Sequence, residues 1–342
     1  MTAHAACSCP DHSVQNQKIA PLSVMTDMLR TDMEKVNATI MTQMQSDVPL
    51  IPQLANYLIA AGGKRIRPLL TLAATRLFDD TTQRCHGLAT AVEFIHSATL
   101  LHDDVVDESD ERRGQASARV VFGNQASVLV GDFLFSRSFQ LMVADGSLDV
   151  LRILSNAAAV ISQGEVMQLS IQNRLDATLD QYLEVISAKT AILFAAATEI
   201  GPLIAGKPEY TQALHDYGRA LGMAFQITDD VLDYTGDGAS MGKSVGNDFR
   251  EGKLTAPVFL ALRHAGATER GFWQRCMGDR QQEDGDFAAA VELCHSHDAF
   301  SKSLHLAADY AHAAENALAH LPKSTLRDAL MALPGSILER TT

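Results

Sequence analysis

The sequence predicts an all-α protein built as a single-domain helical bundle. Apolar residues recur three and four positions apart along most of the 342 residues, which is the spacing that one face of a helix requires. No stretch alternates apolar and polar residues convincingly, as a half-buried strand would. The chain also lacks a low-complexity linker, so residues 21–342 are predicted to form one domain.

The composition allows a large core and excludes some functions. Hydrophobic residues make up 46% of the chain and charged residues 20%, so a substantial core can be buried. The formal net charge of -13 argues against non-specific binding of nucleic acid. The five scattered cysteines predict a reduced protein. No apolar run reaches about 18 residues and no signal peptide is apparent, which predicts a cytoplasmic protein without a transmembrane segment.

The N-terminal segment differs from the rest of the chain. Residues 1–20 show no periodicity and are predicted to form a disordered tail. Cys7 and Cys9 could bind a metal together with nearby histidines, but their spacing matches no standard zinc pattern. From Leu22 to about Ser46 apolar residues recur at helical spacing, and we expect a first amphipathic helix there.

A basic loop follows the second helical pattern, at residues 61–68 (Ala-Gly-Gly-Lys-Arg-Ile-Arg-Pro). Its glycines permit a turn, and Pro68 suits the first turn of the next helix. Lys64, Arg65 and Arg67 place three cations within four residues beside a helix start, which suits the binding of a diphosphate. The alternative is a cluster of surface charges.

Six further helices are expected before Leu254. The second is almost entirely apolar until His96 and His102, so it belongs inside the bundle, with its acidic end opening into a cavity. In the fifth, Gly201 and Pro202 are expected to end the helix. The predicted ranges are 68–78, 87–106, 123–143, 147–172, 179–204 and 210–234, and a polar loop is expected near 278–286.

Two acidic clusters organise the candidate site. Residues 103–107 read Asp-Asp-Val-Val-Asp, and residues 229–233 read Asp-Asp-Val-Leu-Asp. In a helix, the first and last aspartates of each cluster lie one turn apart on the same face. Like charges at this spacing destabilise a helix, which indicates that a cation sits between them, and carboxylates without Cys or His suit Mg²⁺. Two solvated acidic faces explain less, because both clusters follow apolar runs that should be buried.

Other polar residues accompany the clusters. His96 precedes Asp103 by seven residues and lies almost on the same helix face, although a lone histidine there is more often a satisfied core residue. The other candidates are an arginine pair after the first cluster, a Lys-Thr pair within a helix, a glutamine before the second cluster and two lysines in a glycine-rich loop: Arg112, Arg113, Lys189, Thr190, Gln226, Lys243 and Lys253.

These groups together fit a ligand that carries diphosphates. Metal ions between the aspartates would grip one diphosphate, and the cations of the 61–68 loop with Arg113 could hold a second one without metal. If the first diphosphate leaves an allylic carbon, Mg²⁺ neutralises its charge as the C–O bond breaks. The resulting carbocation needs a water-free apolar cavity, which buried helices supply. No nucleophile with a paired base is apparent, and this mechanism requires none.

On these residues the sequence resembles the trans-isoprenyl diphosphate synthases, and more narrowly the long-chain polyprenyl (octaprenyl/decaprenyl-type) diphosphate synthases. The resemblance extends from about residue 25 to the C-terminus. It rests on residues 62–68, on both Asp-Asp-x-x-Asp motifs and on Arg112-Arg113-Gly114. It implies a helical bundle of the isoprenoid synthase type with a central active-site cavity, Mg²⁺ as the cofactor, and a homodimer with one active site per subunit.

The resemblance also implies a role for each candidate residue. The Mg²⁺ ligands would be Asp103, Asp107 and Asp229, supported by Asp104, Asp230 and Asp233. Isopentenyl diphosphate would bind to Lys64, Arg67, His96 and Arg113. The allylic diphosphate primer would bind to Arg112, Lys189, Lys243 and Lys253. Thr190 and Gln226 would face the carbocation.

The turn before the first cluster predicts the product length. Ala98 and Thr99 are small there, whereas relatives with short products often carry aromatic rings at these positions. The growing chain can then pass along about 20 Å of helix towards Thr90. We expect an octaprenyl to decaprenyl product of the kind used for quinone side chains, a stop at Phe135 or Phe139, and transient membrane contact during product release. The alternative is that the two small residues only pack against another helix.

Two other functions share some of these features. A terpene cyclase has the same fold and the first metal motif, but it needs no second diphosphate site. Its second metal motif also normally includes Asn and Ser or Thr. A non-catalytic subunit that regulates a synthase would typically have lost aspartates, whereas both sets are intact here. The sequence therefore favours the catalytic synthase.

Overall fold

The computed structural model describes residues 20–60, 63–78, 81–112, 114–236 and 245–339. Helices account for almost all regular structure in these ranges, which confirms the all-α prediction. The exception among the described residues is a two-stranded antiparallel hairpin of β1 (Glu111–Arg112) and β2 (Gln115–Ala116). The predicted tail with Cys7 and Cys9 lies outside these ranges, apart from residue 20.

The helices follow one another through short connections. In the first half they are α1 (Pro21–Met28), α2 (Arg30–Gln43), α3 (Leu50–Ala60), α4 (Ile66–Arg76), α5 (Arg84–Val106), α6 (Ala118–Phe122), α7 (Asn124–Asp145) and α8 (Leu148–Ile171). In the second half they are α9 (Leu179–Ile186), the π-helical turn η1 (Ser187–Ala191), α10 (Ile192–Ile204), the short 3₁₀ turn η2 (Pro208–Tyr210), α11 (Thr211–Thr235), α13 (Asn247–Arg250), α14 (Ala256–Leu262), α15 (Ala267–Trp273), the π-helical turn η3 (Gln274–Gly278), α16 (Asp286–Ser296), α17 (Ala299–Ala317) and α18 (Thr325–Leu338).

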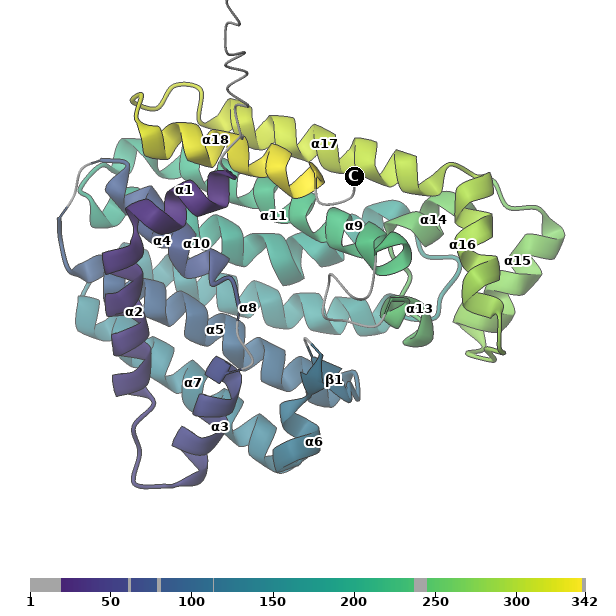
Figure 1. Ribbon diagram of the computed structural model, residues 1–342, viewed down its shortest axis with the longest axis horizontal. Coiled ribbons are helices and arrows are strands. Elements are labelled where there is room, and N and C mark those ends of the chain that lie inside the picture. The colour runs from purple at the N-terminus through teal and green to yellow at the C-terminus, as the bar shows by residue number, and fades with distance from the viewer. Residues whose placement is uncertain (1–19, 61–62, 79–80, 113, 237–244, 340–342) are drawn as a thin grey trace, which may run out of the picture.

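The long helices stack across the molecule, and α5 and α11 lie near its centre (Figure 1). α5 packs along α7 and α4, and α10 packs against α4, α8 and α11. α11 is covered on its other side by α17. Buried residues form two apolar clusters, a larger one around α4, α5, α7 and α10 and a smaller one around α14, α15 and α16. The acidic ends of α5 and α11 are thereby fixed on two rigid central helices.

Two predicted helices are interrupted in the structure. The single helix expected over residues 22–46 breaks at Leu29 into α1 and α2. The helix expected over 179–204 contains the turn η1, and it continues through Gly201 and Pro202 to Ile204. The helix ends at Ile204, as predicted, and Gly201 lies in its last turns. A Cβ at Gly201 would lie 2.4 Å from the Cβ of Ala74, so the glycine admits α4 at close range.

α7 is unusually exposed for a long apolar helix. It is the one helix among the described residues that is long and apolar enough to cross a membrane by length and composition, and 39% of its most apolar window is buried inside the molecule. Helices in the cores of water-soluble proteins meet the same criterion. Asp132 lies on its exposed side, with its side chain 63% exposed and 3.5 Å from His102.

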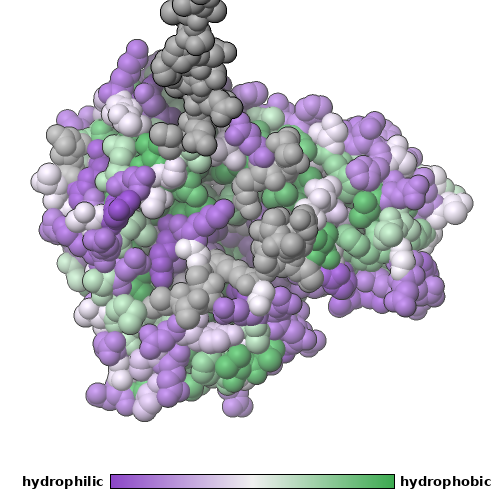
Figure 2. Space-filling model, in the orientation of Figure 1, coloured by the Kyte–Doolittle hydropathy of each residue, from purple (hydrophilic) through white to green (hydrophobic). Residues whose placement is uncertain are grey.

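The hydrophilic face drawn in Figure 2 carries an apolar patch at its lower edge, over α6. Val120 and Val121 of α6 are 51% and 49% exposed. α6 begins two residues after β2, and its preceding residue Ser117 donates a hydrogen bond to the carbonyl of Ser109, beyond the end of α5. This patch therefore lies beside the segment that follows the first acidic cluster.

Candidate active site

The first acidic cluster lies at the C-terminal end of helix α5, and its aspartates lie in two different environments. Asp107 accepts a hydrogen bond from the Lys253 ammonium at 2.7 Å, and Lys189 Nζ lies 3.9 Å from Asp103. Asp104 is only 2% exposed, and one of its oxygens accepts both Nε and Nη2 of Arg112 at 2.8 and 2.6 Å. The outer two carboxylates therefore meet lysines, and the inner one is held by an arginine.

The surroundings of Asp103 favour its neutral form. Burial raises the pKa of Asp103 from 3.8 to about 7, because its charged form is poorly solvated. Lys189 opposes this shift, whereas the carboxylates of Glu165 and Asp107 add to it. A carboxylate this close to others gains most from an additional cation.

The second acidic cluster lies near the C-terminus of α11. Asp230 is 3% exposed, accepts a hydrogen bond from the Tyr182 hydroxyl, and accepts another from the Gln226 amide at 2.8 Å. Burial raises the pKa of Asp230 to about 7; these two hydrogen bonds oppose the shift, and the charges of Asp229 and Asp233 add to it. The inner aspartate of this cluster is thus supported by neutral donors.

The outer aspartates of the second cluster have different neighbours. Asp233 accepts the backbone N–H groups of Asn247 and Asp248 at 3.2 and 3.0 Å, which caps the short helix α13. Asp229 makes no hydrogen bond or ion pair within the ranges that the structure describes. Its carboxylate is therefore open to a ligand.

The turn η1 connects the two clusters. Lys189 extends to Asp103 of the first cluster, and the next residue, Thr190, donates a hydrogen bond to Gln226 Oε1 at 2.9 Å beside the second. Gly164 of α8 allows this approach, because a Cβ there would lie 3.0 Å from the Lys189 backbone nitrogen. π-helical turns of this kind often occur at functional sites.

Some residues that contact the candidate site residues were not predicted from the sequence. Glu165 accepts a hydrogen bond from Lys189 at 2.7 Å, and Gln168 accepts a second one at 3.2 Å. Tyr182 supports Asp230 from α9. The only sequence signal for the first two is a pair of polar residues on a helix face that also carries Gly164, and Tyr182 has no local signal.

Lys253 lies between the two clusters. Burial alone would lower its pKa, but the carboxylates of Asp107 and Glu251 outweigh burial and raise the pKa above its usual value. The ammonium therefore stays charged at neutral pH. The buried carboxyl of Asp248, another residue missed in the sequence, has a pKa well above its usual value because of burial and of the nearby Asp233 and Asp230, an effect that Lys253 opposes.

The basic loop leads into α4 and has an ordered arginine. Arg67 Nη1 lies 3.1 Å from His96 Nε2, and its guanidinium stacks over the Phe194 ring with 4.5 Å between the guanidinium carbon and the ring centroid. Arg65 pairs with Glu93 at 3.4 Å, while Lys64 is exposed. The structure thus brings together Arg67 and His96, two of the residues that the resemblance assigns to one diphosphate. Two other predicted residues, Arg113 and Lys243, lie outside the described ranges.

Ala98 and Thr99 lie on α5, on the turn before the first cluster. Ala98 is 1% exposed, and the half-buried Thr99 donates a hydrogen bond to the carbonyl of His96 at 2.8 Å. On the facing helix α7, the rings of Phe135 and Phe139 pack edge to face, and Phe139 is 36% exposed. The small side chains therefore leave the wall of α5 without bulk at this level.

The donor set fits Mg²⁺ completed by a ligand. Within the described ranges, no three His, Cys, Asp or Glu residues lie close enough to hold a metal ion alone. Asp103, Asp107 and Asp229 offer oxygen ligands only, and Mg²⁺ typically takes one or two carboxylates with waters and substrate phosphates. The open carboxylate of Asp229 and the poorly solvated Asp103 are consistent with this mode.

Comparison with known proteins identifies the family. The family model described as polyprenyl synthetase matches residues 48–294. The chain belongs to the polyprenyl synthetase family. The chain is 43% identical over 320 residues to octaprenyl diphosphate synthase of Escherichia coli (strain K12), covering 93% of this chain and 99% of that protein.

Solved structures agree with this assignment. A decaprenyl diphosphate synthase from Rhodobacter capsulatus is 50% identical, with a TM-score of 0.90 over 94% of this chain and 100% of that one. A polyprenyl synthase from Caulobacter crescentus CB15, complexed with calcium and isoprenyl diphosphate, is 49% identical, with a TM-score of 0.91 over 95% and 100%. The predictions of a trans-isoprenyl diphosphate synthase of the long-chain type and of its fold are confirmed.

Proposed function

We propose that this polyprenyl synthetase is a Mg²⁺-dependent prenyltransferase that condenses isopentenyl diphosphate head-to-tail onto an allylic diphosphate. Its product would be a long all-trans polyprenyl diphosphate, and residues 21–342 would form the one catalytic domain. The observation that carries the proposal is the turn η1, where Lys189 contacts the first acidic cluster and Thr190 contacts the second through Gln226. Both clusters would thereby face one reaction centre.

The allylic diphosphate would bind between the clusters. Asp103, Asp107 and Asp229 would hold Mg²⁺, which supplies positive charge to the leaving diphosphate. Asp104, Asp230 and Asp233 would hold the surrounding structure, as their contacts with Arg112, Tyr182 and α13 support. The cations proposed to contact the allylic diphosphate directly are Arg112, Lys189, Lys243 and Lys253.

Isopentenyl diphosphate would occupy the basic site at the start of α4. Lys64, Arg67, His96 and Arg113 would hold it, and the stacking of Arg67 on Phe194 supports a fixed guanidinium there. After the allylic C–O bond breaks, the π-electrons of isopentenyl diphosphate would attack the allylic cation to form the new C–C bond. The released diphosphate would then accept a proton from C2 of the isopentenyl unit, which forms the new double bond. Thr190 and Gln226 would face that cation with their oxygens, because the two side chains are already hydrogen-bonded to each other.

The product would be octaprenyl to decaprenyl diphosphate, and the small residues Ala98 and Thr99 support this length. We propose that such a polyprenyl chain serves as the precursor of a quinone side chain. Ala98→Phe and Thr99→Phe should shorten the product drastically while the first condensations continue, because a ring would block the path along α5. Unchanged product lengths in both folded variants would show that the chain grows elsewhere.

We also propose a homodimer in the cytoplasm. Leu129 and Val143 of α7, together with Val166 and Leu169 of α8, are 54–67% exposed, which is unusual for large apolar side chains and is consistent with a covered face between subunits. The apolar patch on α6 would make transient contact with a membrane during product release (Figure 2). Nucleic acid is not an expected partner, since the net charge is -13.

The direct test is a product assay with purified protein, isopentenyl diphosphate, an allylic primer and Mg²⁺. We expect a long linear polyprenyl diphosphate, and none when Mg²⁺ is removed by EDTA. A cyclic product without consumption of isopentenyl diphosphate would indicate a terpene cyclase. No product from the protein alone, but altered products when a partner synthase is added, would indicate a non-catalytic regulatory subunit.

A further inference from the structure

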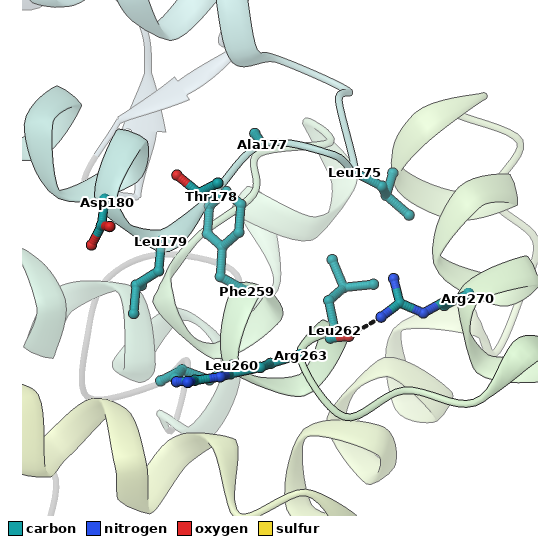
Figure 3. A pocket seen from close by; sticks show the side chains of 10 residues that line it. All are labelled: Leu175, Ala177, Thr178, Leu179, Asp180, Phe259, Leu260, Leu262, Arg263 and Arg270. Atoms are coloured by element: carbon teal, nitrogen blue, oxygen red, sulfur yellow. Dashed lines mark hydrogen bonds between the residues drawn. The ribbon is translucent and has the colours of Figure 1, made fainter.

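A surface pocket that neither acidic cluster lines lies between the α8–α9 connection, α9, α14 and α15 (Figure 3). Its volume is about 430 Å³, within the range of roughly 300–1,000 Å³ that is usual for small-molecule sites. Leu175, Leu179, Phe259 and Leu262 form much of its wall. None of the residues assigned to the proposed reaction lines it.

Two arginines give this pocket a cationic side beside its apolar residues. Arg270 donates Nε and Nη2 to the carbonyls of Ala265 and Leu262 at 3.2 and 3.1 Å, which fixes its guanidinium at the wall (Figure 3). Arg263 also lines the pocket and, like Arg270, forms no ion pair with a carboxylate among the described residues. Asp180 is the one acidic residue of the lining, so the cations outnumber it.

We propose that this pocket is a second ligand site, which takes a free amphipathic phosphate: a phosphate or diphosphate head on an apolar chain. The arginines would bind the head, since guanidinium groups match phosphate oxygens in pairs. The leucines and Phe259 would cover the chain. This charge is local, because the protein as a whole has a net charge of -13.

The pocket wall also contacts the support of the second acidic cluster. The Phe259 ring packs on the Tyr182 ring with 5.7 Å between centroids, and the Tyr182 hydroxyl donates its hydrogen bond to Asp230. An occupant that displaces Phe259 would therefore alter the position of Tyr182. We include in the proposal that occupancy changes turnover, a part that rests on the proposed function.

Binding is tested with n-decyl phosphate below its micellar concentration, in buffer with EDTA. The fluorescence of Trp273, the single tryptophan of the chain, reports on α15 one turn after Arg270. We expect saturable binding of n-decyl phosphate, and at least tenfold weaker binding of inorganic phosphate and of n-decanol. Either fragment binding as tightly as the whole probe would overturn the amphipathic assignment.

Two variants locate the binding. Arg263→Glu reverses an exposed charge, and Ala177→Phe fills the pocket from the α8–α9 connection. Each should weaken probe binding at least tenfold and leave basal turnover and thermal stability near wild type. Arg152→Glu, an exposed arginine of α8 outside the pocket, is the matched control and should bind the probe normally. Normal binding to Arg263→Glu or to Ala177→Phe would overturn the site.

Two further experiments test whether the bound ligand regulates turnover and whether that ligand is free in solution or part of a membrane. The probe should change kcat at saturating substrates in the wild type and in Arg152→Glu, but not in Arg263→Glu; binding without any such change would overturn the regulatory part alone. The binding arm needs no catalysis, so failure of the proposed synthase activity would leave it intact. If the wild type sediments with vesicles of phosphatidic acid and phosphatidylcholine but Arg263→Glu does not, the assignment to a free ligand is overturned.

Discussion

The two acidic clusters have nearly the same sequence but are stabilised in different ways. In the first, the buried Asp104 is neutralised by the full charge of Arg112. In the second, the buried Asp230 has only the neutral donors Tyr182 and Gln226. A cation beside a buried carboxylate offsets the free-energy cost of burying the charge, whereas neutral hydrogen-bond donors offset less of that cost.

The outer carboxylates differ in the same sense. Asp103 and Asp107 face the ammonium groups of Lys189 and Lys253. Asp229 has no such partner in the described part of the chain, and Asp233 caps α13 through backbone N–H groups. The first cluster thus carries its own counter-charges, while the second leaves the charge of Asp229 for an incoming cation to balance.

The largest effect is expected from removing one outer carboxylate of either cluster. Asp103→Ala and Asp229→Ala should each lower kcat by at least about 1,000-fold, roughly 4 kcal/mol, because each would remove a metal ligand. Circular dichroism should show an intact fold. Asp132→Ala, an exposed aspartate on α7, is the control and should retain turnover. Near-normal turnover of either cluster variant at saturating Mg²⁺ would refute the metal assignment.

Arg112, which pairs with Asp104, should contribute more to the free energy of unfolding than Tyr182, which donates to Asp230. Arg112→Ala should lower the free energy of unfolding by about 3 kcal/mol, because it leaves the buried charge of Asp104 unpaired. Tyr182→Phe should cost only about 1 kcal/mol, since it removes one neutral donor. Both are measured by urea unfolding. Adding Asp104→Asn to Arg112→Ala should restore part of the loss; equal losses in the two single variants would contradict the comparison.

The cations should divide between two substrates. Lys64→Ala and Arg67→Ala should raise the KM for isopentenyl diphosphate by about 10- to 100-fold, corresponding to one or two lost charged contacts. Lys253→Ala should instead raise the KM for the allylic substrate or lower kcat, because Lys253 contacts Asp107. Steady-state kinetics with each substrate varied in turn measures this. If both sets raise the same KM equally, the two-site division is wrong.

The stability of the metal-free protein should depend on pH through the two poorly solvated aspartates. The pKa values of Asp103 and Asp230 are both raised to about 7 from 3.8, so between these values the folded state binds protons that the unfolded state releases. The free energy of unfolding should therefore fall as pH rises from about 4 to 7, by at most about 1.4 kcal/mol per pH unit for each group. Asp230→Asn should flatten the urea-derived profile; an unchanged slope would contradict the assignment.

The sequence predicted those parts of the site that depend on local spacing. The aspartates one turn apart follow from helix periodicity, and the cations of residues 64–67 follow from a short basic motif beside a helix start. Glu165 and Tyr182 could not be predicted, because they meet Lys189 and Asp230 only through tertiary packing, 24 and 48 residues away in the chain. The turn η1 was also missed, since the apolar pattern continues on both sides of it.

The central claim is that both clusters together bind one metal–diphosphate group. Calorimetry with Mg²⁺ and an allylic thiodiphosphate, which resists cleavage, tests this claim without turnover. We predict tight binding to the wild type only when Mg²⁺ is present, and at least about 100-fold weaker binding to both Asp103→Asn and Asp229→Asn. Equal affinity with and without Mg²⁺, or full affinity in either variant, would contradict the account.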